Sequence, residues 1–166
     1  MVFTEGYLQI TIPKATNIRK FDDGASHGLS HCMKAVDFIV EMPDHLMFIE
    51  IKDPENPIST PENREQYITK FTSGLLDESL KYKYRDSFLY EWAAGRTRKP
   101  IYYYVLITIE RLCAADLLVR TDELKRKLPL HGPESGDWNR QIVNGCAVFN
   151  INSWLRTFPD HKIERI

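Results

Sequence analysis

Residues 34–52 read KAVDFIVEMPDHLMFIEIK, and apolar side chains alternate with other residues along both halves of this segment. Alternation with a period of two is typical of β-strands. Pro43 and Asp44 separate the two halves. Proline presets the first central torsion of a type I turn and aspartate suits the second. The segment is therefore predicted to form a β-hairpin that turns at these two residues.

Folding the hairpin about this turn places Val40 opposite Met47 and Asp37 opposite Glu50. Directly opposed carboxylates, with Cβ atoms about 5 Å apart, repel each other unless a proton, a cationic side chain or a metal ion lies between them. Lys52 falls on the same face, one pleat beyond Glu50. A bulge would change this register. Without one, the hairpin presents two acids and a lysine on one face.

Two converging acids beside a lysine suit metal-assisted hydrolysis of a phosphodiester. Oxygen ligands favour Mg²⁺ or Mn²⁺, which keep several waters and take further ligands from substrate phosphate. We expect Asp37 and Glu50 to hold the ion, with the main-chain carbonyl of Ile51 as an added ligand. Lys52 would orient or deprotonate the attacking water, whose pKa the ion lowers.

Asp37, a twelve-residue gap and then Glu50-Ile51-Lys52 at a strand end resemble the PD-(D/E)XK nuclease superfamily, which has the restriction-endonuclease-like fold. The resemblance covers roughly residues 30–110. It implies a nuclease that uses Mg²⁺ or Mn²⁺ and acts on nucleic acid, with DNA ahead of RNA because DNA substrates are commoner in that superfamily. Members usually begin with a helix that donates another acid. No such helix is evident here, and the candidates for that acid are Glu5, Asp22 and Asp23.

The whole chain has 166 residues and is 43% hydrophobic, which is enough for one core and one domain spanning residues 1–166. The chain opens with neither a basic region nor an apolar run, and its longest apolar stretch, Ile101 to Ile109, is too short for a membrane span. We therefore expect a cytoplasmic protein with no membrane contact. The net charge of −1 disfavours tight nucleic-acid binding unless basic residues concentrate on one face.

Histidine and cysteine residues gather at His27, His31 and Cys32. A zinc site needs four ligands, and no second cluster completes the set. The functional alternative is that His31 or Lys34 approaches the mouth of the active site. The three cysteines are widely separated, which argues against a disulfide framework.

Secondary structure beyond the hairpin follows from periodicity and from residues that break it. Leu8, Ile10 and Ile12 predict an early strand. A Ser59–Glu62 capping box predicts a helix, and residues 62–94 form one broken helix or two. The remaining expected elements are a strand buried on both faces at 100–110, a helix at 114–128 with Leu117, Leu118, Leu124 and Leu128 inward, a strand at 146–151 and one or two helical turns at 152–158.

Basic residues recur along the helical segment, and Lys81, Lys83 and Arg85 are the predicted nucleic-acid-binding residues on its outer face, with Arg96, Arg98 and Lys99 farther along. The alternative is a solvated helix face on which Lys83 pairs with Asp86.

These elements predict an α/β single-domain sandwich, restriction-endonuclease-like, with a mixed central β-sheet flanked by helices. The first functional hypothesis is a divalent-metal-dependent nuclease with Asp37, Glu50 and Lys52 as catalytic residues. The alternative is a catalytically inactive nuclease-like scaffold that acts as a protein or nucleic-acid interaction module. A homodimer and recruitment by a larger protein partner both stay open. The sequence has neither a Gly-x-Ser-x-Gly nucleophile elbow nor a glycine-rich phosphate loop.

Overall fold

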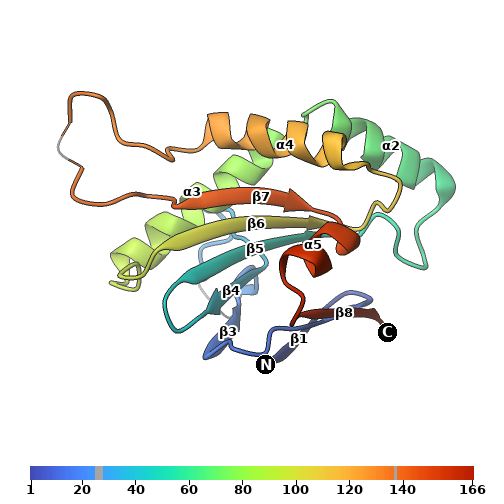
Figure 1. The fold of residues 1–166 in the computed structure, drawn as a ribbon, viewed down its shortest axis with the longest axis horizontal. Helices are drawn as coiled ribbons and strands as arrows, with labels where there is room; N and C mark the ends of the chain where they lie inside the picture. The colour runs from blue at the N-terminus through green and yellow to red at the C-terminus, as the bar shows by residue number, and fades with distance from the viewer. Residues whose placement is uncertain (25–27, 137) are drawn as a thin grey trace.

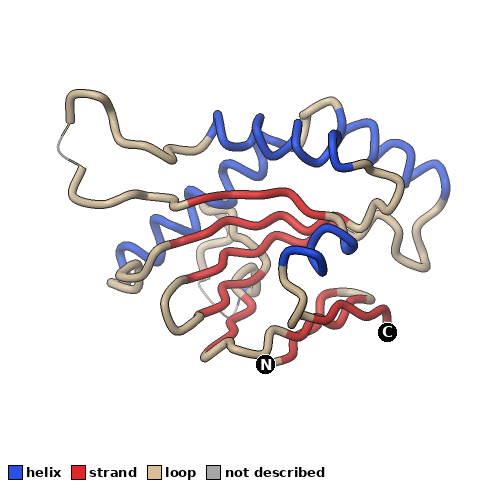
Figure 2. Tube along the Cα trace, viewed as in Figure 1, coloured by secondary structure: helices blue, strands red, loops and turns tan. Residues whose placement is uncertain are grey.

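A five-stranded mixed sheet forms the centre of the computed structural model, which describes residues 1–24, 28–136 and 138–166 (Figures 1 and 2). Its strands, in spatial order, are β3 (Asn17–Lys20), β4 (Phe38–Glu41), β5 (Leu46–Lys52), β6 (Ile101–Ile107) and β7 (Gly145–Phe149). β3, β4 and β5 pair antiparallel, whereas β5, β6 and β7 pair parallel. The predicted mixed sheet is confirmed, and the predicted strand at 100–110 is present as β6, between β5 and β7.

The β4–β5 hairpin has the register that the sequence predicts. Phe38 pairs with Ile49 and Val40 with Met47. The turn closes where the amide of Met42 donates to the carbonyl of His45 at 2.8 Å, with Pro43 and Asp44 between them. No bulge shifts this pairing, so Asp37 and Glu50 stand opposite each other immediately beyond the last paired residues.

Three helices cover one face of the sheet (Figure 2): α2 (Pro61–Thr72), α3 (Asp77–Ala93) and α4 (Ala114–Lys127). The core beneath them is aromatic at its centre, because the Tyr84 ring of α3 lies 5.6 Å from Phe48 and 5.1 Å from Tyr103. All three of these side chains are buried. α3 therefore packs against β5 and β6 at Tyr84.

The opposite face carries a second, three-stranded antiparallel sheet and a short helix, α5 (Ile151–Thr157). The small sheet consists of β1 (Val2–Glu5), β2 (Leu8–Thr11) and β8 (Lys162–Arg165), with β2 in the middle. Leu8, Ile10 and Ile12 are buried there beside Trp154. The predicted early strand is present, and the helices that flank the central sheet share this layer with a small sheet that the sequence did not predict.

The predicted helix at 62–94 is two helices. Gly74 sits between them with φ +81°, a conformation that suits glycine. A Cβ atom at this position would lie 2.5 Å from Nη1 of Arg120, which bonds Asp77 at 3.1 Å. The junction therefore needs both the left-handed backbone and the missing side chain.

Two details of these helices differ from the prediction. The cap of α2 is Thr60, which accepts from the amide of Asn63 at 3.3 Å, so the predicted box beginning at Ser59 is one residue early. In α4, Leu117 and Leu124 are buried but Leu118 is 58% exposed. Adjacent residues of a helix point about 100° apart, so Leu118 cannot share the inward stripe of Leu117.

Among the described residues, no helix combines the length and apolar character that crossing a membrane requires. Cys32, Cys113 and Cys146 are free thiols, and the first two are exposed.

Candidate active site

The hairpin brings Asp37 and Glu50 together beneath α3. Asp37 precedes β4 and Glu50 lies near the end of β5; Asp37 is 4% exposed and Glu50 is fully buried. Residues two apart in a strand share a face, so both acids lie on the same sheet face as Ile39 and Phe48. Those two residues pack in the core under the helix layer. The acid pair is therefore a polar site set into the edge of an apolar core.

Asp37 is oriented by the backbone of the opposite strand. The amide of Ile51 donates to Asp37 Oδ2 at 2.6 Å. The N–H and C=O of one strand residue point toward the same neighbouring strand, so the Ile51 carbonyl also faces the Asp37 side. Its side chain packs in the core on the other face of the sheet. The role of the Ile51 carbonyl as a metal ligand stays a prediction.

Lys83 of α3 joins the acid pair. Its Nζ lies 3.2 Å from Asp37 Oδ1, 2.7 Å from Glu50 Oε1 and 2.9 Å from Glu50 Oε2. The predictions that Lys83 lies on the outer face of the helix, or pairs with Asp86, are both wrong. Lys83 follows the buried Leu80 by one helical turn and therefore shares its inward stripe. Asp86 instead accepts from the amide of Lys34 at 2.8 Å.

Lys52 approaches the same carboxylate from the strand end. Its ammonium is in contact with Glu50 Oε1, and its side chain is 31% exposed, so it also reaches solvent. Glu50 Oε1 therefore lies between two ammonium groups, those of Lys52 and Lys83. Both positive charges oppose the buried carboxylate pair from within the chain.

Burial dominates the electrostatics of Glu50. Loss of solvent and the neighbouring charge of Asp37 raise its pKa to about 7, against the opposing effect of Lys52 and Lys83. For Lys83, burial alone would lower the pKa, but attraction to Glu50 and Asp37 and hydrogen bonds to both raise it. Lys83 is therefore charged, while Glu50 changes protonation near neutral pH.

The three candidates for an additional N-terminal acid occupy different places. Glu5 in β1 bonds the ammonium of Lys20 at 3.0 Å, and Asp23 is exposed. Asp22 is also exposed, yet its carboxyl is partly enclosed, and this enclosure, followed by the negative charge of Asp37, raises its pKa. Asp22 is therefore electrostatically coupled to the acid pair, which favours it among the three candidates.

Two pockets adjoin this sheet face. One, of about 190 Å³, is lined by Glu50 and Lys52 together with Tyr67 and mainly apolar residues of α2 and α3. The Tyr67 hydroxyl in this wall has no hydrogen-bond partner among the described residues, and burial, followed by the charge of Glu50, raises its pKa. The second pocket, of about 480 Å³, lies at the opposite end of the sheet.

Of the basic residues predicted on the outer face of α3, Lys81 and Arg85 lie beside an exposed tyrosine ring, whereas Lys83 contacts the acid pair. The ring of Tyr82, itself 41% exposed, is flanked by three cations: Lys81 Nζ at 4.7 Å, Arg85 Cζ at 5.4 Å and Lys34 Nζ at 5.9 Å from the ring centroid. Lys81 also pairs with Glu78 at 2.5 Å. We call Lys34, Lys81, Tyr82 and Arg85 the Tyr82 patch.

The histidine and cysteine cluster lies partly outside the described residues, since His27 falls there. His31 and Cys32 are exposed. Within residues 1–24, 28–136 and 138–166, no three His, Cys, Asp or Glu side chains are grouped so that they could hold a metal ion. Asp37, Glu50 and the Ile51 carbonyl supply two carboxylates and one backbone oxygen. That set suits Mg²⁺, which is commonly held by one or two carboxylates with water and substrate phosphate.

Comparison of the chain with models of protein families, with curated proteins and with solved structures finds no match.

Sequence reasoning put Lys83 on the outer face of the helix and missed Tyr67. A signal for Lys83 was present, because it stands one turn from Leu80 and one turn from Ser87, both buried. Tyr67 follows the cap of α2 by two turns and gave no comparable signal.

Proposed function

We propose that the protein is a divalent-metal-dependent nuclease whose active site is built from Asp37, Glu50 and Lys52. One observation carries the proposal: two buried carboxylates oppose each other on a hairpin, with a partly exposed lysine at the strand end in contact with one of them. Opposed buried carboxylates repel each other, and strongly perturbed acids of this kind gather at functional sites.

In this proposal Asp37 and Glu50 hold Mg²⁺ or Mn²⁺ together with the carbonyl of Ile51. When bound, the ion supplies a Lewis acid and lowers the pKa of a water molecule. Lys52, which reaches solvent, orients that water and stabilises negative charge on the phosphate. The Ile51 amide holds Asp37 in place throughout. The resemblance to the PD-(D/E)XK superfamily supports the same roles and favours DNA over RNA.

The Tyr82 patch supports contact with nucleic acid beside the site, since it lies on the exposed side of the helix that carries Lys83. Cations around an exposed aromatic ring suit a phosphate backbone and a stacked base. This role belongs to Lys81 and Arg85, whereas Lys83 belongs to the acid pair.

A second candidate function rests on Lys83. Its ammonium lies between the two carboxylates, so Asp37 and Glu50 are opposed by the charges of Lys83 and Lys52 within the chain. That balance favours a non-catalytic nuclease-like scaffold that binds protein or nucleic acid.

Thermal melts with Mn²⁺ discriminate between the two candidates. A nuclease is expected to gain stability with Mn²⁺ by mass action, and Asp37→Asn is expected to lose that gain. Asp44→Asn, which removes an exposed acid from the turn of the same hairpin, is the matched control and should keep it. Hydrolysis of labelled single-stranded and duplex DNA and of RNA is followed in parallel. An equal Mn²⁺ shift in the parent and in Asp37→Asn, with no cleavage, would favour the scaffold.

A further inference from the structure

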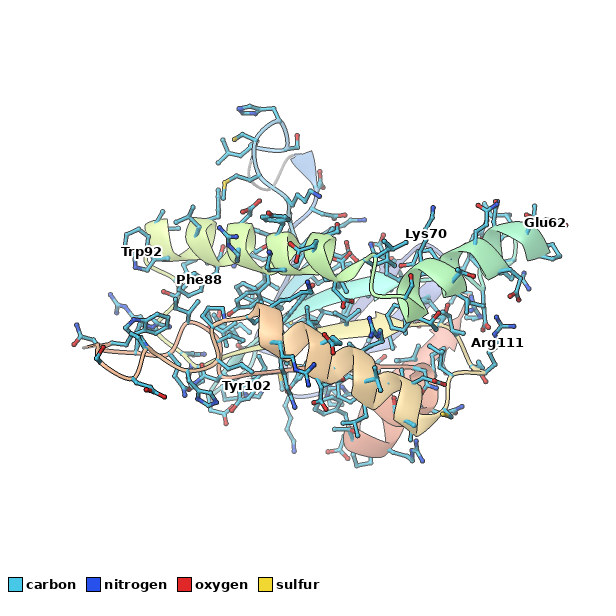
Figure 3. The ribbon with its side chains drawn as sticks, turned by 90° about the horizontal axis from the view of Figure 1, so that it is seen from above. Glu62, Lys70, Phe88, Trp92, Tyr102 and Arg111 are labelled. Carbon is cyan, nitrogen blue, oxygen red and sulfur yellow. The ribbon has the colours of Figure 1, made fainter. Side chains whose placement is uncertain are left out.

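The pocket of about 480 Å³ is built from basic side chains at the far end of the sheet face that carries the acid pair. Its cations are Arg19 of β3 and, from the segment after α3, Arg96, Arg98 and Lys99. Only two acids, Glu41 and Glu91, line it. Trp92 in Figure 3 marks the end of α3 at which this pocket lies.

A buried glutamate fixes two of these arginines. Glu91 has no exposed surface and accepts four hydrogen bonds: from Arg19 at 3.1 and 2.6 Å and from Arg96 at 2.9 and 2.8 Å. Burial alone would raise the pKa of Glu91, but the hydrogen bonds from Arg96 and Arg19 lower it, so the carboxylate is ionised. Each guanidinium uses two of its five N–H groups to bond Glu91, so neither is used up by the glutamate alone.

The remaining cations complete a positive surplus. Lys99 bonds Glu41 at 2.8 Å and the carbonyl of Met42 at 2.7 Å. Arg98 is exposed and forms no ion pair with the described residues. Four cations against two acids, with two guanidinium groups held in fixed positions, make a site prepared for an anion. Planar guanidinium groups match phosphate in particular.

We propose that this pocket binds a backbone phosphate of the nucleic-acid strand that the acid pair acts on, with Glu91 as the residue that positions Arg19 and Arg96. The proposal rests on the proposed nuclease function. Leu46 in the pocket wall and Glu50 are four residues apart on β5, about 13 Å at 3.3 Å per residue. A few nucleotides cover that span, since a strand rises about 3.4 Å per nucleotide in a duplex.

The test measures DNA binding in EDTA, where no cleavage proceeds, by fluorescence anisotropy over a range of salt concentrations. Arg98→Glu changes an exposed side chain and is expected to weaken binding of a labelled oligonucleotide about tenfold. It should also reduce the slope of log affinity against log salt by about one unit. Arg156→Glu, an exposed arginine on α5 across the sheet, is the control and should leave both quantities unchanged.

Glu91→Gln tests the positioning role. With Arg19 and Arg96 still present, it should weaken strand binding several-fold, and a thermal melt checks that the variant is folded. Competition with ATP separates the strand from a free nucleotide as the source of the phosphate. If ATP binds in an Arg98-dependent way while oligonucleotide binding ignores Arg98→Glu, the proposal is overturned.

The two proposals fail separately. A parent protein that cleaves DNA, with the salt slope unchanged in Arg98→Glu, would overturn the phosphate pocket and leave the nuclease intact. An Arg98-dependent slope in a protein that never cleaves would support the pocket and overturn the nuclease.

Discussion

Two glutamates with no exposed surface, Glu50 on β5 and Glu91 on α3, have opposite surroundings. Glu91 accepts four N–H groups from two arginines, and its pKa is lowered. Glu50 faces Asp37 and the ammonium groups of Lys52 and Lys83, and its pKa is raised to about 7.

The difference indicates that Glu91 stabilises the fold, whereas burial of Glu50 beside another carboxylate lowers its stability. Planar guanidinium groups satisfy a carboxylate in fixed geometry, so Glu91 behaves as a structural anchor for the basic pocket. A carboxylate next to another carboxylate is costly, and strongly perturbed acids of this kind gather at functional sites. The comparison therefore supports the proposed catalytic role of Glu50 and the proposed positioning role of Glu91.

The largest expected effect is on cleavage. Lys52→Ala should lower the single-turnover rate by about 10²-fold, the scale of losing one acid–base or electrostatic group. The Mn²⁺-dependent rise in melting temperature should persist, because Lys52 is not a metal ligand. Glu50→Gln should lose both the rate and the Mn²⁺ effect. Rates are measured with labelled DNA under Mg²⁺ and under Mn²⁺.

Asp44→Asn serves again as the control for loss of a hairpin charge and should cleave at the parental rate. Full activity in both Lys52→Ala and Glu50→Gln would point to a different active site or to a contaminating nuclease. In either case the distinction between the two glutamates would lose its functional meaning.

The same isosteric change should have opposite effects on stability at the two positions. Glu91→Gln leaves two guanidinium groups without their counter-charge and should destabilise the protein by about 2 kcal/mol. This value is below the range for fully buried ion pairs because both arginines reach solvent. Glu50→Gln removes a buried charge opposed to Asp37 and should stabilise the metal-free protein by about 1 kcal/mol at about pH 8. Denaturant unfolding in EDTA gives both values.

The pH dependence sharpens this contrast. The pKa of Glu50 rises from 4.5 to about 7 on folding, so between these pH values the folded state binds more protons than the unfolded state. The contribution of Glu50 to the free energy of unfolding therefore falls as pH rises through this window. The pKa of Glu91 is lowered, so its contribution is complete above its ordinary value and is lost only in acid. Glu50→Gln should therefore flatten the pH profile between 4.5 and about 7, whereas Glu91→Gln should keep the decline. An unchanged profile in Glu50→Gln would contradict the raised pKa.

Local sequence patterns predicted the features that depend on near neighbours. Alternation and Pro43 set the hairpin and its register, which was enough to place Asp37 opposite Glu50. The apolar run at 100–110 correctly predicted a strand, β6, although Tyr102 and Tyr104 on one of its faces are only partly buried. In contrast, β8 has a single apolar residue, Ile163, and gains its pairing from β2 at the other end of the chain. A contact between the two termini leaves little trace in a short polar segment.

Side chains that reach across the fold were harder to predict. The basic residues around Lys83 in the sequence suggested a solvated helix face. In the structure α3 packs over the hairpin, and the Lys83 ammonium contacts both acids. Arg19 and Glu91 lie 72 residues apart, and only the tertiary packing of β3 against α3 brings them together. Their pairing is therefore a property of the assembled core and could not be derived from periodicity.

A tenfold effect is expected at Lys83, which can sharpen or break the contrast between the two glutamates. Its ammonium lies within 3.2 Å of both acids, so it competes with a divalent cation for the same oxygens. Lys83→Met should therefore destabilise the metal-free protein, because opposed carboxylates lose a counter-charge, and raise the apparent affinity for Mn²⁺ about tenfold, or about 1.4 kcal/mol. Titration calorimetry measures the affinity.

Lys81→Met, two residues earlier on α3 and paired with Glu78, is the control and should bind Mn²⁺ like the parent. A variant that is destabilised yet gains no Mn²⁺ affinity would show that Lys83 is the permanent cation of the cluster. Glu50 would then resemble Glu91 as a paired structural acid, and the scaffold function would be favoured over the nuclease.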